Sequence, residues 1–215
     1  NTALSNEYMG KYPVVFISFK DVNGLTFDRA YDALVQIIGE IANGFSFLMN
    51  SDKLSKNEKE QYQGIIQIKD GKYHMSDGVV ISSLKVLSQL LTKHYGKNTI
   101  FIIDEYDVPL DKAFQHGYYD EMVELIRGIL GKVLKTNDYL QFAILTGCLR
   151  ISKESIFTGI NNFKVLSILD ARFDEQFGFS DDEVKNLLAD YGLASHFEEA
   201  KEWYDGYHFG NVDVY

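Results

Sequence analysis

Three carboxylates follow directly on a continuous apolar run. Residues Thr99–Ile103 are all β-branched or aromatic, and Asp104, Glu105 and Asp107 come immediately after them. An apolar run of this length is typical of a strand that is buried on both faces of a parallel sheet. Open α/β sheets bind their ligands at the carboxyl ends of such strands. The pattern therefore predicts either a metal site at the end of a strand or an acidic, solvated loop.

Asp104 and Glu105 have the residue types and the order of a nucleotide-hydrolysis site. An apolar strand that ends in Asp-Glu is the Walker B pattern, in which the aspartate holds Mg²⁺ and the glutamate polarises the attacking water. Neighbouring residues on a strand point to opposite faces, so the two side chains would have separate tasks. Asp107 is interpreted as a structural cap of the loop rather than as a metal ligand.

Further polar residues follow a second apolar run. Thr146 comes directly after Leu140–Leu145, where it would either contact a γ-phosphate or form a plain strand-to-loop turn with Gly147. Arg150 lies just beyond, and its guanidinium would either bind phosphate or pair with nearby carboxylates. Both positions are candidates whose role depends on how the strands are arranged.

Apolar runs alternate with helical patterns along the chain. Strands are predicted at 13–19, 99–103, 140–145 and 163–169. Helices are predicted at 26–42, 79–95, 118–136, 180–191 and 195–204, with a loop at 109–117 and an aromatic turn at 204–210. This alternation predicts an α/β fold with a parallel sheet. We assign residues 1–170 to the core and 171–215 to a small helical appendage.

Composition narrows the class of protein. The 215 residues are 46% apolar and 14% aromatic, which is enough for a full hydrophobic core. A net charge of −10 argues against binding of nucleic acid over the whole surface. The single cysteine, Cys148, excludes an internal disulfide and is interpreted as a small buried residue.

No apolar stretch is long enough to cross a membrane, no signal peptide is visible, and the five histidines lack zinc-ligand spacing. A cytoplasmic location is expected.

Four motifs occur in a fixed order. They lie at Ile102–Leu110, Leu145–Asn162, Phe177–Val184 and Trp203–Gly210. Together they resemble the bacterial AAA-ATPase-like family, whose longer members often carry a nuclease-like domain of the PD-(D/E)XK type. The resemblance covers almost the whole chain.

This resemblance implies an α/β core of the additional-strand P-loop ATPase type, with a three-layer parallel sheet and a helical appendage. It implies that Asp104 holds Mg²⁺, that Glu105 is the catalytic acid, that Thr146 is the sensor on the next strand and that Arg150 is a phosphate-side cation. ATP and Mg²⁺ are the implied ligands of the parent protein. An attached nuclease-like domain is an implied partner, and a homo-oligomer and nucleic acid stay open as further partners.

The phosphate-binding (Walker A) loop of such ATPases is absent from the sequence. No run of the form Gly-x-x-x-x-Gly-Lys-Ser/Thr occurs. The resemblance places this loop and the first strand upstream of residues 13–19, so we expect the chain to begin after them and to bind neither ATP nor Mg²⁺ alone. The sheet would then have a vacancy between 140–145 and 163–169. We expect one of three outcomes: residues 163–169 move to pair with 140–145, another segment of the chain fills the vacancy, or two chains complement each other.

Two functions follow from these expectations. The first is an ATPase-like domain whose parent protein uses ATP and Mg²⁺ to drive an attached domain, with residues 1–215 inactive alone. The alternative is a non-enzymatic protein-interaction module on a degenerate ATPase fold.

Overall fold

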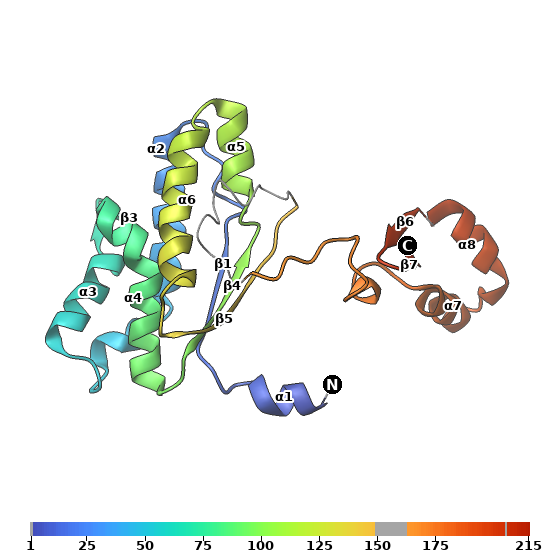
Figure 1. The fold of residues 1–215 in the computed structure, drawn as a ribbon, viewed down its shortest axis with the longest axis horizontal. Coiled ribbons are helices and arrows are strands. Elements are labelled where there is room, and N and C mark those ends of the chain that lie inside the picture. Colours follow the sequence, from blue (N-terminus) through green and yellow to red (C-terminus); the bar gives the residue numbers. More distant parts are fainter. Residues whose placement is uncertain (1, 149–162, 205) are drawn as a thin grey trace. The chain divides into compact units, whose positions relative to one another are not determined.

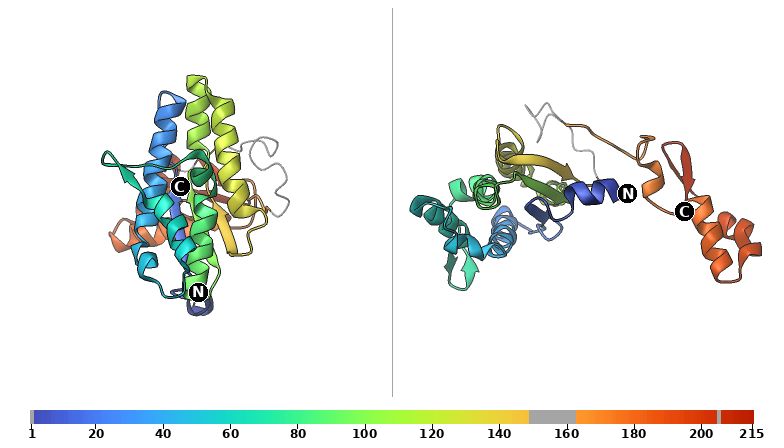
Figure 2. Two further views of the ribbon diagram at one scale, coloured as in Figure 1. Left: turned by 90° about the vertical axis from the view of Figure 1, so that its left-hand side faces the viewer. Right: turned by 90° about the horizontal axis from the view of Figure 1, so that it is seen from below.

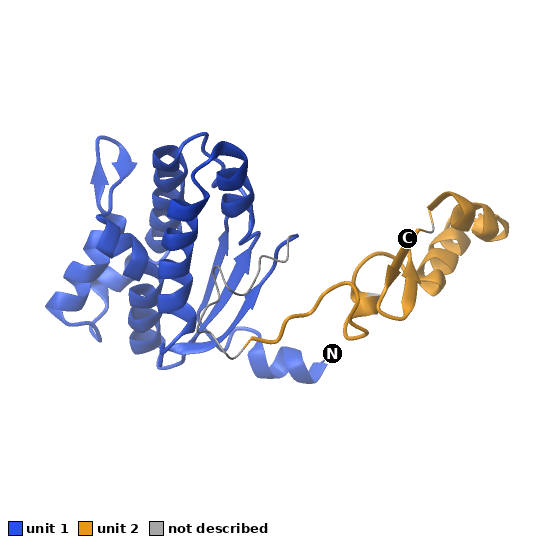
Figure 3. Cartoon of the chain, turned by 45° about the horizontal axis from the view of Figure 1, so that its top comes forward, with its two compact units in different colours: residues 1–160 blue, residues 161–215 orange. Residues whose placement is uncertain are grey.

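The computed structural model describes residues 2–148, 163–204 and 206–215. The chain divides into two compact units, residues 1–160 and residues 161–215 (Figure 3). Each unit is described by itself. Within the described residues, no helix is both long enough and apolar enough to cross a lipid bilayer.

A three-stranded parallel sheet forms the centre of the first unit. Its strands are β1 (Val14–Ser18), β4 (Thr99–Asp104) and β5 (Leu140–Leu145), in the order β1-β4-β5 (Figure 1). Ser18 pairs with Asp104, and Ile103 pairs with Leu145, so the three strands end at the same edge of the sheet. The fold is therefore α/β with a parallel sheet, and the predictions of its three strands are confirmed.

Helices cover one face of this sheet (Figures 1 and 2). The helices of this unit that follow β1 are α2 (Phe27–Asn43), α3 (Lys56–Ile66), α4 (Asp77–Tyr95), α5 (Val108–His116) and α6 (Tyr119–Leu134). Thr26 caps α2 by accepting a hydrogen bond from the backbone N–H of Arg29, and Gly96 ends α4 in the left-handed conformation. A short helix, η1 (Ser46–Asn50), and a small hairpin, β2 (Ile68–Lys69) with β3 (Lys72–Tyr73), complete this layer.

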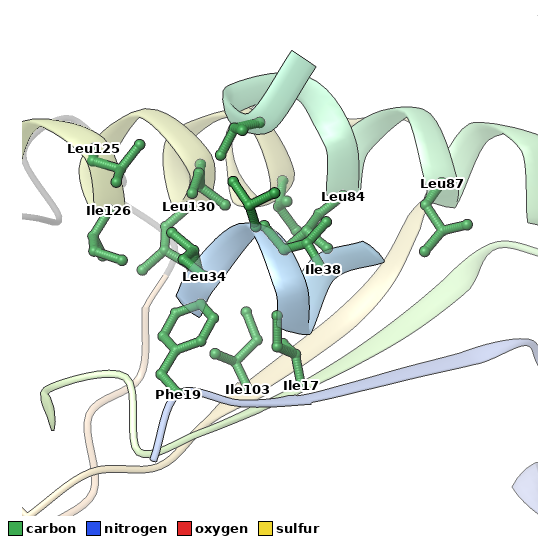
Figure 4. Close-up of a cluster of buried hydrophobic side chains, with 14 of the residues drawn as sticks. Ile17, Phe19, Leu34, Ile38, Leu84, Leu87, Ile103, Leu125, Ile126 and Leu130 are labelled. Carbon is green, nitrogen blue, oxygen red and sulfur yellow. The ribbon is translucent and has the colours of Figure 1, made fainter. Parts of the chain in front are cut away.

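The hydrophobic core lies between the sheet and these helices (Figure 4). The sheet contributes Ile17 and Ile103, while Leu34, Leu84 and Ile126 come from α2, α4 and α6. All five side chains are completely buried. Truncating one such side chain to alanine typically costs about 2–5 kcal/mol, so this layer holds the strand ends in place.

The opposite face of the sheet is largely bare within the described residues. It carries the partly exposed side chains of Val14, Phe16, Phe142 and Ile144. A short helix, α1 (Thr2–Tyr8), approaches it through an edge-to-face contact of Tyr8 with Phe142. The three-layer sheet that we expected is thus present as two layers in the part of the chain that the structure describes.

Two local predictions were wrong. Residues 163–169 form no strand, and several of their apolar side chains are exposed, because a short apolar run is a strand only when a partner strand meets it. The expected loop at 109–117 is mostly α5, since Pro109 occupies the first turn of a helix, where its missing N–H costs nothing. For residues 1–12 the sequence predicts no element, and the structure places α1 there.

The second unit consists of small elements. They are η2 (Asp174–Gln176), α7 (Asp181–Asp190), η3 (Ala194–His196), α8 (Phe197–Tyr204) and a hairpin of β6 (Tyr207–Phe209) with β7 (Val212–Val214). The predicted capping box of Ser180 and Glu183 opens α7. Of the expected aromatic turn at 204–210, Tyr204 ends α8 and residues 207–210 belong to this hairpin, whose turn includes Gly210 at a positive φ.

Candidate functional site at the carboxyl ends of the strands

Main-chain hydrogen bonds fix the ends of the three parallel strands against one another. The N–H of Phe19, just past β1, donates to the carbonyl of Asp104 at 2.9 Å. The N–H of Thr146, just past β5, donates to the carbonyl of Ile103 at 2.9 Å, and the N–H of Tyr106 donates to the carbonyl of Thr146 at 3.1 Å. The backbone around Asp104 is therefore held from both sides.

Asp104 and Thr146 are in direct contact at this edge. The hydroxyl of Thr146 donates a hydrogen bond to Oδ1 of Asp104. The two residues are far apart in sequence, and the parallel pairing of β4 with β5 brings them together. Asp104 is half-buried and Thr146 is exposed, so solvent reaches this edge of the sheet.

Glu105 has an unusual backbone. Its φ is +52°, in the left-handed region that residues other than glycine enter at a cost. The chain turns out of the sheet at this residue, so Glu105 does not continue the alternation of side chains along β4. That alternation was our reason to expect separate tasks for Asp104 and Glu105. Strained backbone of this kind is concentrated at active sites and ligand-binding loops. Glu105 is half-buried at this turn, directly after Asp104 in the chain.

Asp107 lies where the chain leaves the site and enters α5. It occupies the N-cap position of α5, where its carbonyl accepts hydrogen bonds from the N–H groups of Leu110 and Asp111, both at 3.0 Å. The residue is only 3% exposed, but its side chain makes no capping hydrogen bond to the first turn of α5, so Asp107 caps this helix through its backbone alone.

Gly147 packs onto this cap. A Cβ added to Gly147 would lie 2.6 Å from Oδ1 of Asp107 and 2.9 Å from Cε1 of Tyr106. The position therefore accepts only glycine without movement of its neighbours. The sequence indicated a turn at Thr146-Gly147 but did not reveal this close approach, because the partner lies forty residues earlier in the chain.

Two other sequence candidates have different outcomes. Arg150 lies outside the described residues, so its role as a phosphate-side cation stays a prediction. Cys148 is exposed, and its interpretation as a buried residue was wrong. It follows Gly147 beyond the end of β5, where the chain has left the core, and residue type alone does not reveal that.

The oxygen ligands at the strand ends suit a magnesium-bound nucleotide better than a free-standing metal. Ser18 pairs with Asp104 in the sheet and adds a hydroxyl near the same edge, and Thr146 adds another. Among residues 2–148, 163–204 and 206–215, no group of three or more His, Cys, Asp or Glu side chains is placed to hold a metal ion. Mg²⁺ in nucleotide sites is held by one or two carboxylates together with substrate phosphates, and a single carboxylate with neighbouring hydroxyls meets that need.

Comparisons with known proteins identify the family of the chain. The sequence model of the AAA-ATPase-like family, described as "Predicted AAA-ATPase", matches residues 2–157. A curated relative from Azotobacter chroococcum mcd 1, an uncharacterised protein in the vnfD 5' region, is 28% identical over 121 residues. That match covers 56% of this chain and 23% of the relative, so the chain spans less than a quarter of the relative's length. No solved structure matches the chain.

Proposed function

Because this chain belongs to the AAA-ATPase-like family, we propose that its strand-end site is the magnesium side of an ATP-hydrolysing centre. The observation that carries the proposal is the hydrogen bond from Thr146 to Asp104 across the ends of neighbouring parallel strands. Ligands of open α/β sheets bind at this edge. The family match covers all the residues of the described site.

Each residue of the site has a separate role in the proposal. Asp104 would hold Mg²⁺ through its carboxylate, and Thr146 fixes the orientation of that carboxylate by donating to Oδ1. Glu105 orients a water molecule and accepts its proton. When bound, Mg²⁺ neutralises charge on the phosphates of the nucleotide. Ser18, on the other neighbouring strand, offers a hydroxyl to the same edge.

The phosphate-binding element of the proposed site lies outside these residues. The sequence contains no Gly-x-x-x-x-Gly-Lys-Ser/Thr run, although phosphate-gripping loops need its successive backbone N–H groups. We therefore propose that the parent protein supplies this loop and couples ATP hydrolysis to an attached domain. The 215 residues alone then have no measurable ATPase turnover.

The test uses the full-length protein that contains this chain. Binding of a fluorescent ATP analogue is titrated with Mg²⁺ and with EDTA, and phosphate release is measured in parallel. Asp104→Asn should abolish the Mg²⁺-dependent part of binding, and Glu105→Gln should retain binding while losing hydrolysis. Asp111→Asn is the matched control, because Asp111 is an acid on nearby α5 that pairs with Lys112 rather than with the site.

The alternative, a non-enzymatic interaction module on a degenerate ATPase fold, rests on the absence of the phosphate loop from this sequence. It predicts no nucleotide-dependent thermal shift in the full-length protein. Equal nucleotide binding by the wild-type, Asp104→Asn and Asp111→Asn proteins would also contradict the magnesium site. A clear turnover by residues 1–215 alone that disappears in Glu105→Gln would overturn the proposed need for an external loop.

A further inference from the structure

The second unit carries most of the negative charge of the chain. Residues 161–215 contain twelve acidic and four basic residues, a net charge of −8 out of −10 for the whole protein. The first unit is therefore almost neutral. A charge this concentrated selects partners of opposite sign and repels those of like sign.

The same unit leaves its apolar side chains uncovered. Among its described residues, Val214 alone is fully buried. Large apolar side chains such as Tyr191, Leu193, Trp203 and Tyr204 are exposed, with Trp203 at 76%. Exposed apolar clusters of this kind mark interaction sites on soluble proteins.

Part of this apolar surface forms a shallow depression, wide open to solvent, between α7 and α8, here called the α7–α8 groove. Its volume is about 510 Å³, and its apolar lining consists of Leu188, Leu193, Ala200, Trp203 and Tyr204. The residues contributed by α8 recur at helical spacing, so one stripe of this helix lines the groove. Tryptophan and tyrosine are the side chains that most often dominate the energy of a protein interface.

Negative charge lies at the groove itself. Glu199 belongs to its lining and contacts His196, the other polar lining residue, at 2.9 Å. Glu198 and Glu202 are exposed on the same helix. The two lysines of the helix pair are directed to the start of α7, since Lys185 and Lys201 lie 3.9 Å and 3.5 Å from Oδ2 of Asp181.

We propose that the α7–α8 groove binds a basic amphipathic helix of a partner protein. An amphipathic helix docks by placing its apolar stripe in such a groove, and basic residues along the edges of that stripe would meet the acids of α8. The charge disfavours other occupants of the groove. A second copy of this unit would bring another net −8, and nucleic acid and anionic lipid surfaces are repelled in the same way.

Trp203 makes the proposal directly measurable, because it is the single tryptophan of the chain and lines the groove. The probe is a synthetic peptide of about 18 residues, with leucines at helical spacing and lysines elsewhere, added to the 215-residue protein. Binding should shift the emission of Trp203 to shorter wavelength in a saturable manner and should weaken as salt is added. A peptide with glutamates in place of lysines should give no shift, nor should a scrambled peptide of the same composition.

The chain provides matched control variants. Leu193 lines the groove and Leu187 does not, yet their exposures are 46% and 48%. Leu193→Asp should weaken peptide binding by about tenfold or more, and Leu187→Asp by less than about twofold. Glu199→Gln should weaken binding more than Glu198→Gln, because Glu199 alone of these two lines the groove. Circular dichroism verifies that each variant keeps its fold.

Several outcomes would overturn the proposal. Equal binding of the acidic and basic peptides would remove the role of charge, and equal effects of the two leucine variants would place the peptide elsewhere. Emission already at short wavelength in the protein alone would show that Trp203 is covered within the chain. A shift that depends on protein concentration without peptide would assign the groove to a second copy.

Discussion

A Cβ on Gly147 would lie 2.6 Å from Oδ1 of Asp107, so the loop after β5 and the start of α5 touch where no side chain fits between them. Gly147→Ala should force these segments apart and lower the free energy of unfolding by about 1–3 kcal/mol. Urea unfolding followed by circular dichroism measures the change.

The control for this substitution is Gly131→Ala. Gly131 lies within α6, and an added Cβ there would meet nothing within 4 Å. Alanine favours a helix interior by up to about 1 kcal/mol over glycine, so this variant should be as stable as the wild type or more stable. Equal losses in the two variants would show that the contact with Asp107 has no special weight.

The hydroxyl of Thr146 should matter for nucleotide binding rather than for folding. Thr146→Val keeps the side-chain shape but removes the donor to Oδ1 of Asp104. Because Thr146 is exposed, the free energy of unfolding should change by no more than about 0.5 kcal/mol. In the full-length protein, affinity for Mg²⁺-ATP should fall by about tenfold, in line with the loss of a residue that orients a metal ligand. Thr146→Ser restores the donor and should recover the affinity, and a serine variant as weak as valine would refute the role of the hydroxyl.

The left-handed backbone of Glu105 should separate stability from activity. Glycine occupies a φ of +52° without strain, so Glu105→Gly should raise the free energy of unfolding by about 1 kcal/mol or leave it unchanged while hydrolysis is lost. Glu105→Gln keeps the strain and should lose hydrolysis with no gain in stability. Thermal unfolding and phosphate release measure the two properties.

Asp70 provides the comparison for this pair of variants. Its φ is +51°, and it lies in the turn of the small hairpin rather than at the strand-end site. Asp70→Gly should therefore relieve similar strain and leave hydrolysis by the full-length protein unchanged. Loss of activity in Asp70→Gly would show that a glycine at a left-handed position lowers activity even away from the site, so the loss in Glu105→Gly would not be specific to its carboxylate.

The ion pair of Glu58 with Lys93 gives the protein an acid-sensitive element. Hydrogen bonds from Lys93 and then from Ser55 lower the pKa of Glu58 from 4.5 to about 2. A carboxyl group with a lowered pKa stabilises the fold above its unfolded pKa, and this stability is lost as the pH falls from about 4.5 towards 2. The Lys93 side chain is 45% exposed, so solvent screening limits the contribution to about 1 kcal/mol.

The measurement compares unfolding free energies between pH 2 and pH 6 for two variants. Lys93→Met should flatten the pH dependence in the window below about pH 4.5, because the charged partner is gone. Lys56→Met removes the partner of Glu60, an exposed pair at 3.9 Å, and should leave the profile unchanged. Identical profiles for the wild type and Lys93→Met would contradict the assignment.

The core of the fold was predictable because its signals are local. The apolar runs that became β1, β4 and β5 each alternate with a helix that has one apolar stripe, and Thr26 and Gly96 mark helix ends by their residue types. Residues 163–169 misled us because their apolar character equals that of β5, whereas a strand also requires a partner that no local pattern supplies. Helix α5 was missed because Pro109 was taken for a turn residue.

The candidate site was predictable in part for the same reason. Asp104 and Thr146 follow apolar strands, and parallel order alone brings the ends of neighbouring strands together. The left-handed backbone of Glu105 and the contact of Gly147 with Asp107 were not predictable, since both depend on how the strand ends meet. Arg150 remains a prediction, as do the binding of ATP and Mg²⁺ and the assignment of the site residues to their roles.

The main-chain bonds at the strand ends have a consequence for the history of such domains. Phe19, Asp104, Ile103 and Thr146 are joined through their peptide groups, which do not depend on the side chains at these positions. Mutation can therefore erase the carboxylates without unfolding the domain. A related domain that lost these side chains would therefore keep the fold. The fold alone does not imply catalysis, so the residues at positions 104 and 105 have to be checked separately in each related protein.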